Sequence, residues 1–253
     1  MNKKGGSAMR NYTEEYKNRI EFIRSRLEAA HADGIVFGNS GGKDSALVGI
    51  LCKAACPNTV GIIMPCASKR NYGIDADDGK ELAEKFNIET RIVDLTPVRE
   101  AELKALEGVT EVNQAALTNI APRLRMTTLY TIGAAENRLV AGTGNRSEIY
   151  MGYFTKWGDG ASDFNPIADL TASEVFEFLA FLGGPGSIVH KAPSAGLFEG
   201  QTDEDDMGIT YAAIDHFLET GEATEEQKAI LDRYHSRSEH KRQPIATYEN
   251  WKK

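Results

Sequence analysis

The chain has 253 residues, of which 41% are hydrophobic and 26% are charged, and its formal net charge is −8. These values are ordinary for a globular protein and exclude a fibrous or broadly disordered chain. The acidic excess opposes non-specific attraction to nucleic acid or to an anionic membrane, so we expect neither partner. No apolar run approaches the roughly 20 residues of a membrane helix, and the N-terminus lacks the apolar segment of a signal peptide, which indicates a cytoplasmic protein.

The chain begins with a short polar stretch that precedes a predicted helix. Residues 1–10 are small, polar and glycine-containing, and we expect them to be disordered. We expect residues 11–253 to form one domain. From 13 to 31, apolar residues recur at three- and four-residue spacing among charges, which predicts an amphipathic helix.

After this helix, short apolar runs alternate with helical patterns. A buried strand is predicted at 34–38, followed by a tight glycine turn at 39–42. The further strands are predicted at 60–64, 88–94 and 138–142, and the helices at 44–56, 75–87, 97–107 and 115–137. Strands separated by helices predict an α/β fold, with a Rossmann-like parallel sheet and helices on both faces. The binding site of such a sheet lies at the carboxyl ends of its strands.

The second half of the chain has a different composition. Residues 152–160 are rich in Gly, Asp and aromatic side chains and are predicted to form a loop of the kind that often carries function. Helices are predicted at 171–182 and 223–234. We interpret the acidic run at 203–206 as a solvated face, with a mobile lid over a bound nucleotide as the alternative.

The turn after the first strand has the sequence Ser-Gly-Gly-Lys-Asp-Ser, from Ser40 to Ser45. A strand, a glycine turn and a helix direct backbone N–H groups and the positive end of the helix dipole to one point, which suits a phosphate. Lys43 can neutralise phosphate charge. Asp44 is a carboxylate where the phosphate should bind, so a divalent cation between them, Mg²⁺, is implied. The sequence differs from both the P-loop and the dinucleotide fingerprint, which disfavours the usual nucleotide hydrolases and dehydrogenases.

This turn resembles the Ser-Gly-Gly-x-Asp-Ser loop of ATP-dependent ligases that cleave ATP between the α and β phosphates. The loop fixes that half-reaction and not the product, because related ligases activate different substrates. Several downstream segments occur in the order found in ammonia-dependent NAD+ synthetases: 119–123, 142–143, 147–148, 152–163, 193–197, 203–204 and 239–242. The resemblance spans about 14–253 and implies an adenine nucleotide alpha hydrolase-like fold.

The resemblance also implies a role for individual positions. The positions that match the ATP-binding set are Gly38, Asn39, Ser40, Gly41, Gly42, Lys43, Asp44, Ser45, Thr143 and Ser194. Asp44 and Glu148 match the magnesium ligands. The positions that match the deamido-NAD-binding set are Arg123, Lys156, Asp163, His240 and Lys241. At position 172 the family often has a lysine that contacts ATP, whereas this chain has Ala172, so the expected ATP site excludes that position.

The implied reaction has two steps. The nicotinate carboxylate of deamido-NAD attacks the α-phosphorus of ATP and releases pyrophosphate, and ammonia then displaces AMP to give NAD+. We expect Lys43 and Asp44 to act by positioning and by electrostatic stabilisation, without a covalent enzyme intermediate. Asp163 is a candidate for orienting the ammonia or accepting its proton. The resemblance further implies free ammonia, or ammonia delivered by another protein, as the nitrogen source, and it implies a homodimer.

Two other functions remain open at this point. A tRNA thiolase-like ligase of the same loop family would need catalytic cysteines and a basic surface. Cys52, Cys56 and Cys66 form no Cys-x-x-Cys pair, and the net charge is negative. A non-catalytic adenine-nucleotide-binding protein would need no carboxylate pair, although Ala172 slightly favours it.

Overall fold

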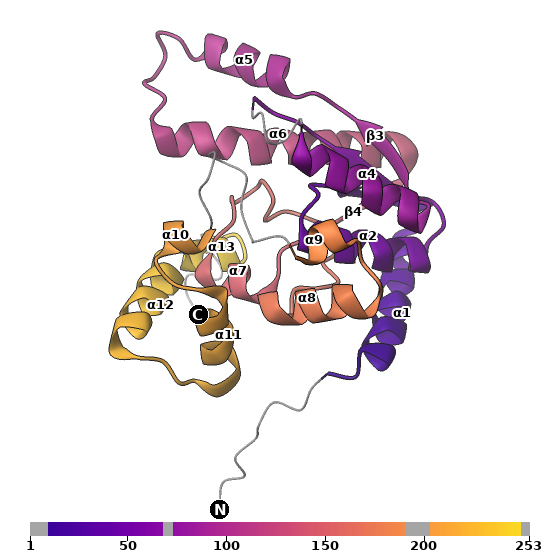
Figure 1. Ribbon diagram of the computed structural model, residues 1–253. Coiled ribbons are helices and arrows are strands. Elements are labelled where there is room, and N and C mark those ends of the chain that lie inside the picture. The colour runs from indigo at the N-terminus through magenta and orange to yellow at the C-terminus, as the bar shows by residue number, and fades with distance from the viewer. Residues whose placement is uncertain (1–9, 68–72, 191–202, 249–253) are drawn as a thin grey trace, which may run out of the picture.

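The computed structural model describes residues 10–67, 73–190 and 203–248 (Figure 1). Of the stretch predicted to be disordered, 1–9 lies outside the described residues. Arg10 is placed, and its guanidinium contacts Glu174 Oε1 at 2.6 Å and Asp169 Oδ2 at 3.1 Å. Within the described residues, no helix is both long and apolar enough to cross a membrane.

A parallel sheet forms the centre of the fold. Its strands are β1 (Gly34–Gly38), β2 (Thr59–Ile63), β3 (Glu89–Ile92) and β4 (Arg138–Ala141), in the order β3-β2-β1-β4. All three pairings are parallel, and in register Val36 of β1 lies between Val60 and Val140. The predicted α/β fold with a parallel sheet is confirmed, and each predicted strand begins within one residue of its place in the structure.

Helices surround this sheet and form a separate layer toward the C-terminus (Figure 1). In the first part of the chain they are α1 (Tyr12–Ala30), α2 (Lys43–Ala55), α4 (Ile74–Phe86), α5 (Thr96–Ala105) and α6 (Gln114–Glu136). After β4 they are α7 (Arg146–Met151), α8 (Ala172–Phe181), α9 (Gly186–Val189), α10 (Asp203–Met207), α11 (Tyr211–Thr220), α12 (Glu225–Arg237) and α13 (Glu239–Arg242). The sequence prediction missed α7 and α11, and it missed that the acidic run begins a helix in which Asp203 is buried.

The two faces of the sheet are covered by different helices, as predicted. Side chains alternate along β1. Ile35 and Phe37 face a cluster built with α1, α2 and α8, whereas Val36 faces a cluster built with α6. A third apolar cluster joins α7, α10, α11 and α12 beside the sheet.

Position 172 belongs to this third cluster. Ala172 is buried, and its backbone N–H donates to Ser147 Oγ at 3.1 Å. The side chain therefore packs in the interior.

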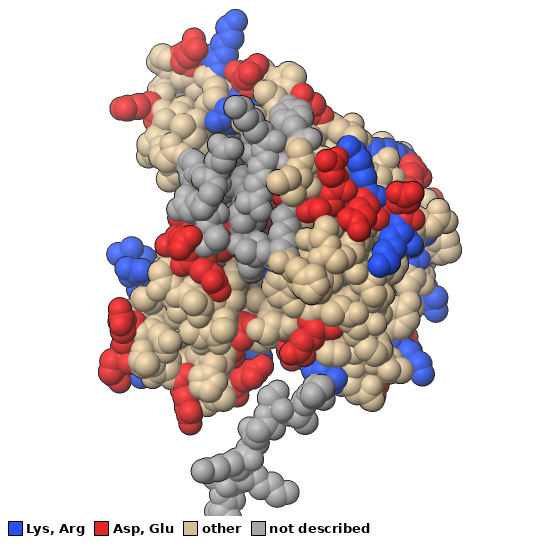
Figure 2. All heavy atoms as spheres, viewed as in Figure 1, with Lys and Arg blue, Asp and Glu red and all other residues tan. Residues whose placement is uncertain are grey.

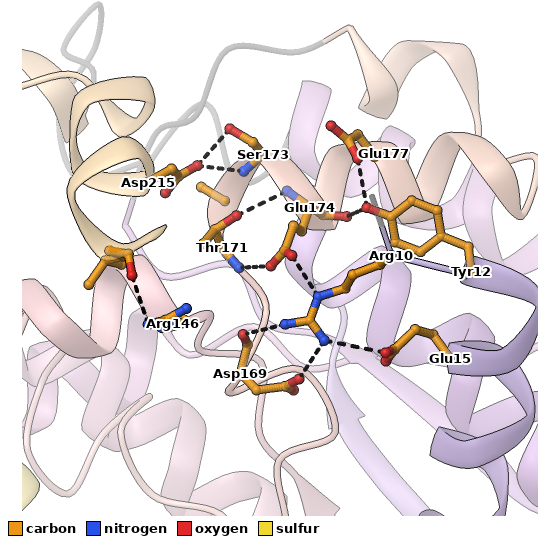
Figure 3. A network of polar contacts seen from close by, with 12 residues as sticks. Arg10, Tyr12, Glu15, Arg146, Asp169, Thr171, Ser173, Glu174, Glu177 and Asp215 are labelled. Carbon is orange, nitrogen blue, oxygen red and sulfur yellow. Dashed lines mark hydrogen bonds and ion pairs between the residues drawn. The ribbon is translucent and has the colours of Figure 1, made fainter. Parts of the chain in front are cut away.

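The start of α8 is held by polar groups from distant parts of the chain (Figure 3). Asp215 of α11 is buried and accepts hydrogen bonds from Ser173 N at 2.8 Å and Ser173 Oγ at 2.6 Å. The other Asp215 oxygen accepts a hydrogen bond from Ser147 Oγ. The carboxylate thereby connects α7, α8 and α11, three helices that follow β4 in the chain.

Replacing Asp215 with alanine is expected to destabilise the protein by about 2 kcal/mol, because the buried hydroxyl of Ser147 and the N–H and hydroxyl of Ser173 lose their acceptor. Urea denaturation followed by circular dichroism measures the change. Asp232→Ala is the matched control, since Asp232 is exposed on α12. Equal midpoints for the two variants would show that the Asp215 contacts contribute nothing to stability.

Candidate functional site

A cavity of about 1050 Å³ opens at the carboxyl ends of β1, β2 and β4. The segments that follow these strands, beginning near Gly38, Ile63 and Ala141, line one part of it, and α12 and α13 line another. This is the edge of the sheet at which the sequence predicted the binding site. Acidic and basic side chains are interspersed over the visible face of the molecule, without a broad basic patch (Figure 2).

The turn after β1 has the conformation that its glycines predict. Gly41 has φ +71°, and a Cβ there would lie 2.2 Å from the carbonyl oxygen of Asp75, so no other residue fits. No side chain caps α2, which begins after Gly42. The first N–H groups of α2 are therefore available to an anion.

Polar side chains brace this turn. Ser40 Oγ and Ser45 Oγ lie 3.0 Å apart, and Ser45 Oγ donates to the carbonyl of Gly42 at 3.0 Å. Asn39 is buried and donates to the carbonyl of Gly79 at 2.8 Å, so its amide also fixes the turn against α4.

Lys43, Asp44 and Glu148 come together beside this turn. Lys43 Nζ lies 2.5 Å from Asp44 Oδ2, and Asp44 Oδ1 accepts a hydrogen bond from Asn145 Nδ2 at 2.9 Å. Asn145 also caps α7, and its backbone N–H donates to Glu148 Oε2 at 3.1 Å. Asn145 thus holds both predicted metal-binding carboxylates, a role that the sequence prediction missed.

The charges of this group depend on one another. Burial and the neighbouring Asp44 carboxylate raise the pKa of Glu148 to about 8. Burial by itself lowers the pKa of Lys43, whereas the carboxylates of Asp44, Glu148 and Asp203 raise it. The effect of the carboxylates is the larger, so the pKa of Lys43 lies above its ordinary value. Lys43 therefore carries its positive charge in the interior, where it compensates several carboxylates.

Residues from the C-terminal layer complete the surroundings of Lys43. Its Nζ lies 5.4 Å from the ring centroid of Phe176 and 5.6 Å from that of Tyr211, which is within reach of cation–π attraction. The Tyr211 hydroxyl donates to Asp203 Oδ2 at 3.2 Å. No sequence motif indicated Phe176 or Tyr211, because each lies over 100 residues from Lys43 and reaches it only by packing.

The residues present fit a magnesium ion. Asp44 and Glu148 are oxygen donors of the kind that Mg²⁺ prefers, and their mutual repulsion, seen in the raised pKa of Glu148, is relieved by a cation. Within 10–67, 73–190 and 203–248, no group of three or more His, Cys, Asp or Glu side chains is placed to hold a metal. Two protein carboxylates with substrate phosphate oxygens and water are a usual magnesium arrangement.

The remaining predicted ATP-binding residues differ in whether they line the cavity. Thr143 and Gly38 line the cavity together with the turn. Gly41 does not line it but shapes the turn through its backbone. Ser194 lies outside the described residues.

The structure brings four of the five predicted deamido-NAD residues together, because Arg123 contacts Lys156 and Lys156 contacts His240, the neighbour of Lys241, whereas Asp163 makes none of these contacts. Lys241 lines the cavity, where its Nζ donates to the carbonyls of Gly152 at 2.7 Å and Phe154 at 2.6 Å. Burial lowers the pKa of Lys241. The other four, Arg123, Lys156, Asp163 and His240, are not among the cavity-lining residues.

These four residues make contacts of their own. Arg123 Nε lies 3.4 Å from the carbonyl of Lys156, and Lys156 Nζ donates to the carbonyl of His240 at 2.7 Å. Asp163 Oδ2 accepts from the backbone N–H of Val140 at 2.7 Å, and Asp163 N donates back to Val140 O at 2.9 Å. The Asp163 carboxylate thus continues the hydrogen bonding of the outer edge of β4.

A family model described as NAD synthase matches residues 15–250. The chain belongs to the NAD synthase family. It is 47% identical over 235 residues to the NH(3)-dependent NAD(+) synthetase of Carboxydothermus hydrogenoformans, covering 92% of this chain and 96% of the relative. The family relationship confirms the prediction of an ammonia-dependent NAD+ synthetase, and it does not favour the thiolase-like or non-catalytic alternatives.

Solved structures of NAD synthase family members share the fold. The NMN synthetase of Francisella tularensis has a TM-score of 0.89 and 38% identity, covering 94% of this chain and 98% of the other. The NH3-dependent NAD synthetase of Campylobacter jejuni has a TM-score of 0.76 and 29% identity, with 94% and 99% coverage. These likenesses confirm the predicted adenine nucleotide alpha hydrolase type of fold.

Proposed function

We propose that this family member activates the nicotinate carboxylate of deamido-NAD with ATP and amidates it with ammonia, giving NAD+, AMP and pyrophosphate. The observation that carries the proposal is the group of Lys43, Asp44 and Glu148 beside the free N-terminus of α2, inside the cavity at the carboxyl ends of the strands. This arrangement suits a nucleoside triphosphate with its cation.

Each step uses groups of this chain. The N–H groups at the start of α2 and the ammonium of Lys43 bind the phosphates and stabilise the charge that develops on the departing pyrophosphate. Asp44 and Glu148 hold the Mg²⁺, which supplies charge neutralisation at the phosphate oxygens when bound. Asn145 orients both carboxylates.

The acyl group is transferred without attachment to the enzyme. The nicotinate carboxylate attacks the α-phosphorus, pyrophosphate leaves, and ammonia then attacks the carboxyl carbon and expels AMP. Burial raises the pKa of the Cys52 and Cys66 thiols, and neither lines the cavity, which supports a mechanism without a thioester. Asp163 remains a proposed ammonia ligand, although its bond to Val140 N supports a structural role instead.

The proposal also covers the oligomeric state of the enzyme and its location in the cell. Arg123, Lys156, Asp163 and His240 do not line the cavity of one chain, so a dinucleotide contact through them requires the substrate to extend beyond the cavity wall. A homodimer in which these residues meet substrate across the interface satisfies this requirement. The proposal places the enzyme in the cytoplasm, with free ammonia as the nitrogen source.

One assay tests this function. The protein is incubated with ATP, Mg²⁺, deamido-NAD and ammonium, and AMP and NAD+ are followed by chromatography. Equal amounts of both products are expected. Absence of NAD+ under all conditions contradicts the proposal, whereas pyrophosphate release with another acid preserves the half-reaction and changes the substrate.

A second candidate substrate is nicotinic acid mononucleotide, whose amide is NMN. The observation that favours it is the higher TM-score to the Francisella tularensis NMN synthetase, 0.89, than to the Campylobacter jejuni NAD synthetase, 0.76. Sequence identity points the other way, because the chain is 47% identical to the NAD(+) synthetase of Carboxydothermus hydrogenoformans and 38% identical to the NMN synthetase. The ratio of kcat/KM for the mononucleotide and for deamido-NAD decides between them. A ratio above one supports NMN synthesis, and a ratio below one supports NAD+ synthesis.

A further inference from the structure

The cavity extends beyond the ATP loop to a row of basic residues on the C-terminal helices. Arg233 and Arg237 of α12 and Lys241 of α13 all line it. They stand four residues apart, which places the two arginines on one face of α12, one turn from each other. The resemblance that assigned Lys241 a role assigned none to the two arginines.

The two arginines are not used to stabilise the fold. Both are exposed, and within the described ranges neither forms an ion pair or donates a hydrogen bond to the protein. Arg233 rests on the ring of Tyr234, with its guanidinium carbon 5.2 Å from the centroid. By contrast, Arg242 donates to several backbone carbonyls and forms an ion pair with Glu239 at 2.8 Å.

Lys241 is oriented by backbone carbonyls and lies within electrostatic reach of the Asp159 carboxylate. Its Nζ donates to two backbone carbonyls, Gly152 and Phe154, and forms no ion pair within the described residues. Three cations thus line one part of a cavity in a chain whose net charge is −8. Their combined charge and the planar donor forks of the arginines suit a phosphate group.

The reaction identifies which phosphate this would be. The nicotinate carboxylate has to reach the α-phosphate of ATP near Lys43 and the start of α2, so ATP occupies that part of the cavity. The phosphate attached to the nicotinate ribose then needs a separate cationic partner. Resting on the proposed function, we infer that Arg237 and Arg233, supported by Lys241, bind the phosphate next to the nicotinate ribose, whether it belongs to the mononucleotide or to the dinucleotide pyrophosphate.

Steady-state kinetics of Arg237→Gln test this site. The KM for the nicotinate nucleotide is expected to rise about tenfold, in keeping with the loss of a charged hydrogen bond, while kcat and the KM for ATP stay near wild type. Lys228→Gln is the matched control, because Lys228 is exposed on the same helix and does not line the cavity. An unchanged nucleotide KM in Arg237→Gln, or an equal rise in Lys228→Gln, would overturn the inference.

Substrate analogues separate phosphate binding from other effects. Nicotinic acid riboside has no phosphate, so Arg237→Gln and wild type should have the same KM for it, whereas a tenfold difference with the riboside contradicts the inference. If Arg237→Gln raises the KM for nicotinic acid mononucleotide, the site binds a single phosphate. If it raises the KM for deamido-NAD alone, the site binds the pyrophosphate. Either pattern supports the site.

Calorimetric titration distinguishes this inference from the proposed function. The wild type and Arg237→Gln are each titrated with nicotinic acid mononucleotide and with deamido-NAD in the absence of ATP. Weaker binding by Arg237→Gln supports the phosphate site even if the wild type forms no amide, a result that would refute only the proposed function. Equal binding of both nucleotides by the two proteins refutes the site and leaves the proposed function standing.

Discussion

Replacing Asp44 with asparagine is expected to lower kcat by at least about 10³-fold, because the variant loses a carboxylate that holds the cation at the phosphates. Asparagine keeps the size of the side chain and can still interact with Asn145, so the fold should persist. NAD+ formation at saturating ATP and ammonium measures the rate. A titration with Mn²⁺, followed by electron paramagnetic resonance, should show weaker metal binding in the same variant.

The matched control for Asp44 is Asp77→Asn. Asp77 is an exposed carboxylate on α4 that pairs with Lys80 at 3.1 Å and does not line the cavity. This control should keep wild-type kcat and metal affinity. Wild-type turnover by Asp44→Asn would rule out the proposed role of this carboxylate, whereas a thermal transition lowered only in Asp44→Asn would indicate a structural role.

The second large effect is expected for Lys43→Met, which should lower kcat by about 10²-fold and raise the KM for ATP. Methionine preserves most of the buried length but removes the charge that opposes Asp44, Glu148 and Asp203. Because Lys43 is proposed to stabilise departing pyrophosphate, product inhibition by added pyrophosphate should also weaken. Initial rates over a matrix of ATP and pyrophosphate concentrations measure all three changes.

Lys53→Met serves as the control for Lys43, because Lys53 is in the last turn of the same helix and donates to the carbonyl of Pro57 at 2.8 Å. It does not line the cavity and should leave the kinetics unchanged. If Lys43→Met lowers the melting temperature while kcat and pyrophosphate inhibition stay at wild-type values, Lys43 serves only to compensate buried carboxylates.

Sequence reasoning was most accurate where the determining contacts are local. The strand at Gly34–Gly38 was predicted with its observed bounds, and α2 within one residue. The glycine requirement at Gly41 was visible because the turn, the strand before it and the helix after it are consecutive in the chain. The short α7 was missed, since six residues show less than two turns of periodicity and its capping residue Asn145 looks like any loop asparagine.

The predicted deamido-NAD residues show what a family resemblance can and cannot predict about a site. It grouped Asp163 with Lys241 as ligands of one molecule. In a single chain, however, Lys241 lines the cavity and Asp163 completes the edge of β4 through Val140. Positions that match a family motif do not by themselves state which surface of the folded chain they occupy.

The sequence by itself determined the α/β alternation, the phosphate-binding turn and the ligase family, because each is encoded in consecutive residues or in an ordered set of motifs. Only the tertiary structure decided which side chains surround Lys43 and which cations share its cavity. Phe176 and Tyr211 reach Lys43, and Arg237 reaches the cavity, through the packing of α8, α11 and α12 against other parts of the chain. That packing is set by apolar burial between segments far apart in the chain, and no local spacing records it.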